Sequence, residues 1–188
     1  MNTILEIKKI VKAECLKPTS HYGFEPYSYH FIPMVKYSKK LALILGADTE
    51  TVEIAAWLHD IGSIMYGRKD HHITGAKEAK KILIRLSYPP HKLERVVECI
   101  KNHRSSTASK CVSIEEKIIS DADAISNFDN LAGLFKAAFI YEDMNQGQAA
   151  KSISDKLTRK WKKLFFKQSQ DIIIKKYDAA MILLEKDE

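Results

Sequence analysis

An adjacent histidine and aspartate, His59 and Asp60, lie in the stretch AAWLHDIGSIMYG, whose other residues are mostly apolar. Such a stretch is typical of a buried helix, and a buried carboxylate without a partner costs free energy or shifts its pKa. Asp60 therefore needs partners from other parts of the chain. The residue types of these partners determine which reaction His59 and Asp60 could support.

The elements that must position this pair are helices. Apolar residues recur at i, i+3, i+4 and i+7 along most of the chain, and runs with period 2 are scarce. The 188 residues, 45% hydrophobic and 29% charged, suffice for one domain with a sizeable core. We predict an all-α helical bundle formed by a single domain, residues 1–188. Its motif-bearing core spans about 28–130, and a C-terminal helical extension spans about 131–188.

The helix boundaries follow from caps and breakers. Pro and Gly keep the segment 17–30 irregular, Asp48 caps one helix that ends at Gly62, and Ser113 with Glu116 forms a capping box. The clearest later break is NQGQ, residues 145–148. The predicted helices cover 3–16, 31–45, 49–62, 71–86, 90–103, 113–126, 131–145, 153–167 and 171–184.

Six potential metal ligands lie on inward-facing lines of these helices. Any one of them is most simply a core residue satisfied by the backbone, but one metal centre would satisfy them all together. The set contains nitrogen and oxygen without thiolate, which favours a catalytic divalent ion: Mn, Fe, Co, Ni, Mg or open-site Zn. The end of a helix at Gly62 would let His59 and Asp60 reach the same ion. The six are His30, His59, Asp60, His72, His103 and Asp123.

These residues also carry a resemblance. LHDIG, preceded by His30 and followed by HHITGA, IKNH and DADAI, resembles the HD superfamily of metal-dependent phosphohydrolases over about residues 28–130. The resemblance implies an HD-type helical bundle with additional C-terminal helices. It also implies that one metal is bound by His30, His59, Asp60 and Asp123, while Asp121 in DADAI is the reserve candidate.

The resemblance leaves open whether the protein binds a second ion. Some members of the superfamily hold it through further histidines, with the aspartate of the doublet bridging the two ions. His72 and His103 match those positions, although such histidines can instead contact the substrate phosphate. We prefer His72 to His71 because His72 shares an apolar line with Ala76 and Ala79. The expected cofactor is thus one or two divalent ions.

Cationic side chains near the ligands could bind a phosphate. Arg68 and Lys69 follow the doublet, and Arg104 follows His103 directly. We expect substrate binding by Arg68, Lys69, Arg104 and Asn127, with catalytic roles for Asp60, Lys69 and Arg104. The alternative for each cation is an ordinary solvated surface charge, and for Asn127 a helix-surface amide.

The expected function is hydrolysis, by metal-activated water, of a phosphomonoester in a nucleotide or another small phosphorylated metabolite. The alternatives are a non-catalytic metal- and nucleotide-binding regulatory module, and a nucleic-acid or cyclic-nucleotide phosphodiesterase. A net charge of +6 favours anionic partners in general. The basic segment 151–167 could bind nucleic acid or a membrane, but a packing helix with a solvated face explains it more simply.

The remaining expectations concern location and partners. The amino terminus has no signal-peptide pattern, no apolar run is long enough to span a membrane, and the three cysteines suit reduced thiols. We therefore expect a cytoplasmic protein with a small phosphorylated substrate and no membrane partner. A nucleic-acid partner is disfavoured, and a homodimer stays open.

Overall fold

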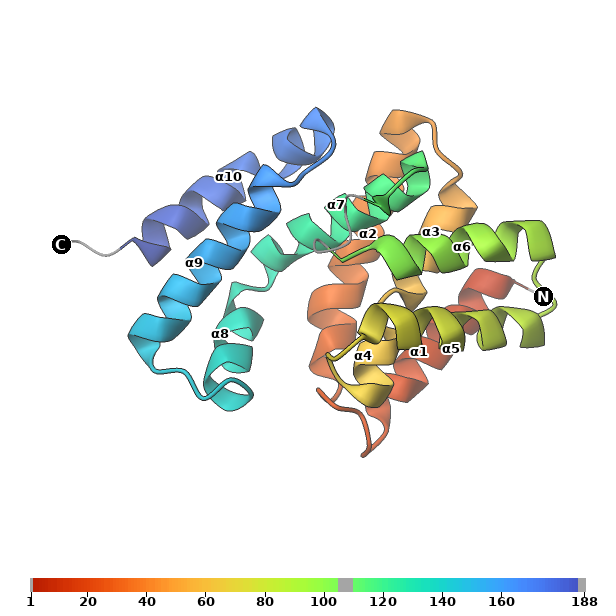
Figure 1. Ribbon diagram of the computed structural model, residues 1–188, viewed down its shortest axis with the longest axis horizontal. Helices are drawn as coiled ribbons and strands as arrows, with labels where there is room; N and C mark the ends of the chain where they lie inside the picture. The colour runs from red at the N-terminus through yellow and green to blue at the C-terminus, as the bar shows by residue number, and fades with distance from the viewer. Residues whose placement is uncertain (1, 105–109, 186–188) are drawn as a thin grey trace.

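The computed structural model describes residues 2–104 and 110–185, and over these residues it is helical without a strand, as predicted. Figure 1 shows α1–α6 gathered on one side, α8–α10 on the other, and α7 between them. None of the helices in the described ranges is long and apolar enough to cross a membrane. The helices are α1 Thr3–Leu16, α2 Ile32–Leu45, α3 Thr49–Leu58, α4 Ile61–Tyr66, α5 His71–Arg85, α6 Pro90–Asn102, α7 Ile114–Ser126, α8 Leu131–Ile140, α9 Gln146–Lys162 and α10 Lys167–Leu184.

The core forms where α2 packs on α3 and α7, and α6 packs on α3 and α5. The apolar stripes of these helices face one another, and their large side chains are completely buried. The predicted caps are present: Asp48 accepts amide hydrogens at the start of α3, and Ser113 and Glu116 form the capping box of α7. The largest buried core side chains include Phe31, Met34, Leu41, Ile54, Leu58, Leu83, Ile100, Ile118 and Ile119.

The C-terminal helices differ from the predicted ranges 131–145, 153–167 and 171–184: α8 ends at Ile140, α9 covers Gln146–Lys162, and α10 begins at Lys167. The predicted break NQGQ starts α9 instead, because Asn145 and Gln148 form its capping box.

Two further differences from the predictions position the histidines. The segment predicted to be irregular ends in a π-helical turn, Tyr27–Phe31, which carries His30. Pro33 has no amide hydrogen, so it cannot donate a helical hydrogen bond to a residue before α2. In the preceding turn the Ile32 N–H donates to the carbonyl of Tyr27, five residues earlier, which is the hydrogen bond of a π-helix.

The second difference lies at the doublet. The helix that begins at Thr49 ends at Leu58 rather than at Gly62, and His59 and Asp60 form the break before α4. Gly62 is inside α4, where an added Cβ would lie 2.4 Å from the Gly75 amide nitrogen and 2.5 Å from the His71 carbonyl oxygen. Glycine is needed there because α4 and α5 touch backbone to backbone. This contact brings the start of α5 beside the doublet.

Asp121 attaches the C-terminal helices to α7. Its side chain is 1% exposed and accepts hydrogen bonds from the Phe165 and Phe166 amides and from the Ser169 hydroxyl. Burial raises the pKa of Asp121 to about 6, although these hydrogen bonds oppose the rise. The reserve metal ligand therefore binds the start of α10, and it is neither exposed nor directed at the histidines.

Replacing Asp121 separates this role from metal binding. Asp121→Ala leaves two amides and a hydroxyl without their acceptor, so we expect the free energy of unfolding to fall by about 1–3 kcal/mol. Bound metal should not change. Denaturant unfolding and elemental analysis measure the two effects, with Asp178→Ala, an exposed carboxylate of α10, as the matched control. A loss of metal in Asp121→Ala at unchanged stability would contradict the assignment.

Candidate metal centre

Four histidine Nε2 atoms from four parts of the chain converge on Asp60. His30 comes from the π-helical turn, His59 from the break after α3, His71 from the first turn of α5 and His103 from the end of α6. The Nε2 atoms of His30 and His59 are 3.0 Å apart, and those of His71 and His103 are 3.3 Å apart. The four rings therefore form two pairs.

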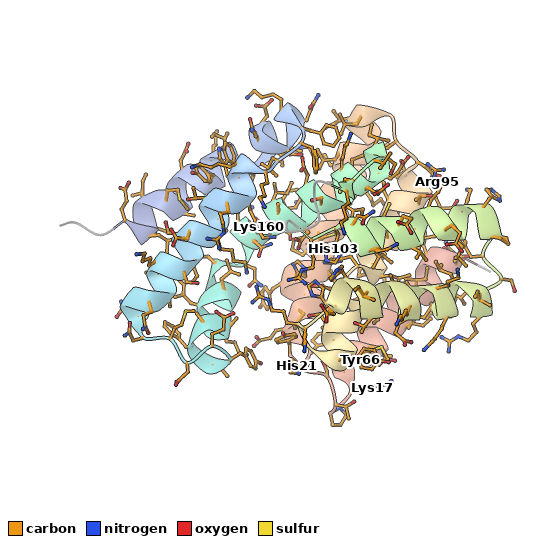
Figure 2. All side chains as sticks on the ribbon, in the orientation of Figure 1. Lys17, His21, Tyr66, Arg95, His103 and Lys160 are labelled. Atoms are coloured by element: carbon orange, nitrogen blue, oxygen red, sulfur yellow. The ribbon has the colours of Figure 1, made fainter. Side chains whose placement is uncertain are left out.

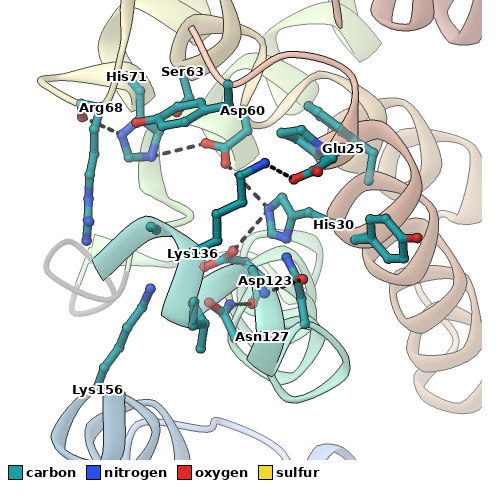
Figure 3. A pocket seen from close by; sticks show the side chains of 18 of the residues that line it. Glu25, His30, Asp60, Ser63, Arg68, His71, Asp123, Asn127, Lys136 and Lys156 are labelled. Atoms are coloured by element: carbon teal, nitrogen blue, oxygen red, sulfur yellow. Dashed lines mark hydrogen bonds and ion pairs between the residues drawn. The ribbon is translucent and has the colours of Figure 1, made fainter. Parts of the chain in front are cut away.

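Asp60 lies between the pairs and presents one carboxylate oxygen to each. Its Oδ2 is 3.4 Å from His30 Nε2 and 3.7 Å from His59 Nε2. Its Oδ1 is 3.2 Å from His71 Nε2 and 3.8 Å from His103 Nε2. Figure 3 shows His30 and His71 on opposite sides of this carboxylate. Two groups that could each hold a cation thus share Asp60.

The other nitrogen of each ring is already used. The Nδ1–H groups of His59, His71 and His103 donate to the carbonyls of Ala56, Arg68 and Ile100 at 2.8, 2.8 and 2.6 Å. His30 Nδ1 lies 3.3 Å from the Ser126 hydroxyl, which donates its own hydrogen to the Asp123 carbonyl. Each Nε2 consequently presents a lone pair, which is the tautomer that a metal ligand requires.

The Nε2 lone pairs of each histidine pair repel each other when no hydrogen lies between them. A cation bound between the rings would remove this repulsion. Burial lowers the pKa of His103 to about 3 and also lowers that of His59, which keeps both rings neutral. Burial alone would raise the pKa of Asp60, but positive charge on the imidazoles of His59, His30 and His71 lowers it well below its usual range, and a cation bound between neutral rings would act in the same direction. Asp60 Oδ1 is also buried without a hydrogen-bond donor among the described residues. Neutral imidazoles around an ionised carboxylate fit a divalent ion.

Asp123 lies at the edge of this cluster. Its Oδ1 is 3.7 Å from His30 Nε2, and its Oδ2 accepts a hydrogen bond from Lys160 Nζ at 2.8 Å. Burial would raise the pKa of Asp123, but the Lys160 ammonium and the neighbouring imidazoles hold it far below its usual value. An ionised Asp123 is thus available to the same cation as His30.

The structure places His71, and not His72, in the cluster, which corrects the preference stated for His72. The His72 ring lies outside, with Nδ1 3.5 Å from an Arg104 guanidinium nitrogen. His71 begins a buried line of α5 that continues, at intervals of four residues, through Gly75, Ala79 and Leu83. This line is hard to recognise in the sequence because Gly75 has no apolar side chain. The alternative line through His72 looks more apolar only because Ala76 carries a methyl group.

A pocket of about 580 Å³ opens over the cluster, lined by residues of both halves of the chain. Arg68, Arg104 and Asn127 line it, and the Asn127 amide donates to the Asp123 carbonyl at 2.6 Å. Lys69 is exposed and does not line the pocket, so the structure gives no support to its predicted binding and catalytic roles.

The pocket also contains cations that the sequence analysis missed. Lys156, Arg159 and Lys160 of α9 line it, and Figure 2 shows Lys160 on the side of α9 that faces the core helices. We expected the lysines of this segment to form a solvated face, yet Lys160 is 8% exposed. Its position one turn after Lys156, beside the buried Ile153 and Leu157, was the available signal.

A model of the HD domain family matches residues 27–127, more than half of the chain. The chain belongs to the HD domain family. The matched segment runs from the π-helical turn to the 3₁₀ turn Asn127–Asp129 and contains all four histidines, Asp60 and Asp123. Helix α9, which supplies Lys156 and Lys160, lies outside it.

Solved structures share the whole fold. The Bacillus subtilis YpgQ protein, solved in complex with ADP, matches with a TM-score of 0.73 and 18% identity over 96% of this chain and 89% of that one. An HD-superfamily hydrolase from Bacillus thuringiensis matches with a TM-score of 0.69 and 18% identity over 96% and 93%. The C-terminal helices are therefore part of a fold found in other HD proteins.

A curated relative matches over part of its length. The tRNA (cytidine(56)-2′-O)-methyltransferase of Picrophilus torridus is 29% identical in an alignment of 135 residues that covers 64% of this chain. The match covers 37% of the relative, so this chain corresponds to little more than a third of that protein.

Replacing each of the neighbouring residues His71 and His72 by alanine tests which of the two is a metal ligand. His71→Ala removes a ring from the His71–His103 pair, so we expect the bound metal to fall from about two ions per chain to about one. His72→Ala, on the same turn of α5, should retain both. Elemental analysis after metal loading measures the difference. Loss of metal in His72→Ala but not in His71→Ala would contradict the placement.

Proposed function

We propose that this HD protein is a metal-dependent phosphohydrolase that cleaves a phosphomonoester of a nucleotide or another small phosphorylated metabolite. The observation that supports it most is the pair of histidine groups sharing Asp60 at the base of a cationic pocket. His30, His59 and Asp60, together with Asp123, would hold one ion. Asp60, His71 and His103 would hold a second.

The residues of the chain divide the chemical work. When bound, divalent ions supply an activated water and positive charge for phosphoryl transfer. Asp60 would contribute one carboxylate oxygen to each group of metal ligands, because its two oxygens lie between the two histidine pairs. Arg68 and Arg104 offer guanidinium donors to phosphate oxygens, and Asn127 holds the backbone of Asp123. The burial of the imidazoles excludes water from all but the open side of the centre.

Aromatic surfaces beside the cations of the pocket support a nucleotide as the substrate. Tyr22, Tyr29 and Tyr141 line it, and the Tyr22 and Tyr141 rings meet edge to face with centroids 5.3 Å apart. Tyrosine rings offer stacking surfaces to a nucleobase, and arginine and lysine bind its phosphate. The complex of YpgQ with ADP supports the same class of ligand.

RNA is the second candidate substrate. The relative from Picrophilus torridus is a tRNA-modifying enzyme, and a segment like this chain forms 37% of it. The net charge of +6 would favour such a partner. A pocket of about 580 Å³ is nevertheless of the size that holds a small molecule, which favours a free nucleotide.

The proposal is tested by metal loading and phosphate release. We expect the protein with added Mn²⁺, Co²⁺, Ni²⁺ or Mg²⁺ to release inorganic phosphate from at least one member of a panel of nucleotides and sugar phosphates. Asp60→Ala should bind less metal and lower kcat by about 10³-fold or more, since both ligand groups lose their shared carboxylate. Asp178→Ala is the control with an equal charge change.

Other outcomes separate the alternatives. Stoichiometric metal with nucleotide binding but no turnover would contradict the hydrolase and favour a regulatory binding module. Cleavage of RNA with a steep dependence on salt, in place of nucleotide hydrolysis, would favour the phosphodiesterase. Full metal content in Asp60→Ala would contradict the metal centre itself.

A further inference from the structure

Lys156 is a cation inside the pocket that the metal centre does not use. Its side chain is half-buried and lines the pocket, and it forms no hydrogen bond or ion pair with the described residues. Figure 3 shows Lys156 extending from α9 toward the pocket and Arg68 reaching toward the same space from the opposite wall. An ammonium that loses water without gaining a partner is unfavourable, so this arrangement suits a bound anion.

The neighbours of Lys156 strengthen this argument. Burial, together with the positive charges of Lys160 and Arg68, lowers the pKa of Lys156 to about 8. Lys160 is already paired with Asp123 at 2.8 Å, and Arg68 with Glu142 at 2.9 Å on the exposed rim. Like charges gathered in a pocket raise the local concentration of anions. Lys156 contributes a charge that no carboxylate of the centre neutralises by direct contact.

The position of Lys156 separates it from the metal ligands. Lys160 contacts Asp123 at the edge of the cluster, and Lys156 lies four residues earlier on α9. Four residues correspond to about 6 Å along a helix. Figure 3 shows Lys156 and Arg68 together on the side of the pocket away from His30 and Asp60, so a phosphate held between them would be a different group from the one held beside Asp60.

We propose that Lys156 and Arg68 bind a second phosphate group of the substrate. The preferred substrate would then carry a phosphate in addition to the one that is cleaved, and a simple monophosphate would bind less well. This inference rests on the proposed function, because the bound molecule is a substrate only if the protein is a phosphohydrolase. The binding site itself is independent of hydrolysis. Because Lys156 lies outside residues 27–127, it would make the C-terminal helices a determinant of specificity within the family.

Binding measurements without turnover test the proposal. Calorimetry in the presence of a chelator would compare adenosine 5′-monophosphate with adenosine 5′-diphosphate and adenosine 3′,5′-bisphosphate. We expect at least one doubly phosphorylated nucleotide to bind about tenfold or more tightly than the monophosphate, the gain of one charge-assisted contact. Lys156→Gln should abolish this preference. Lys151→Gln, an exposed lysine of α9 that does not line the pocket, should retain it.

The outcomes distinguish this site from the hydrolase. Equal affinities for the three nucleotides in the wild-type protein, or an unchanged preference in correctly folded Lys156→Gln, would overturn the second phosphate site while leaving Asp60-dependent hydrolysis intact. A preference that depends on Lys156 in a protein without any phosphatase activity would support the site and contradict only the proposed reaction.

Discussion

The buried carboxylate of Asp60 is the constraint on which the site depends. It lies among four imidazoles whose Nε2 lone pairs all face inward, and one of its oxygens has no hydrogen-bond donor among the described residues. A protein interior does not tolerate such a group without compensation. Divalent ions held by the two groups of ligands would satisfy the carboxylate and all four rings together. The break between α3 and α4 follows from the same constraint, since a continuous helix would turn neighbouring side chains about 100° apart.

The surrounding helices hold the ligands in place by short backbone contacts. Three of the rings donate Nδ1–H to a carbonyl three residues earlier, so each ring is fixed by its own helix or turn. The contact of Gly62 with Gly75 brings α5 close enough for His71 to reach Asp60. The C-terminal helices add Lys160 and Lys156, and Asp121 attaches those helices to α7. In the proposed function the metal ligands all come from residues 27–127, and α9 adds cations from outside that segment to the substrate pocket.

Much of this arrangement could be predicted from the sequence. Helical spacing gave the all-α fold, Ser113 with Glu116 marked the start of α7, and the inward lines identified His30, His59, Asp60, His103 and Asp123 as neighbours in space. The roles of these residues in metal binding stay predictions. Gly62 resembles a helix end in the sequence, because backbone-to-backbone packing of two helices has no pattern in a single sequence. The sequence favours His72 over His71 because Gly75 leaves a gap in the correct line. It does not reveal Lys160 as buried, because a lysine is rarely buried unless it is paired.

The most direct test of a metal centre that shares Asp60 is electron paramagnetic resonance of the protein saturated with Mn²⁺. If Asp60 held two ions, the ions would form a magnetically coupled pair. The uncoupled six-line signal would then appear only in Asp60→Ala or at low occupancy. Uncoupled Mn²⁺ alone in the saturated wild-type protein would contradict a shared Asp60.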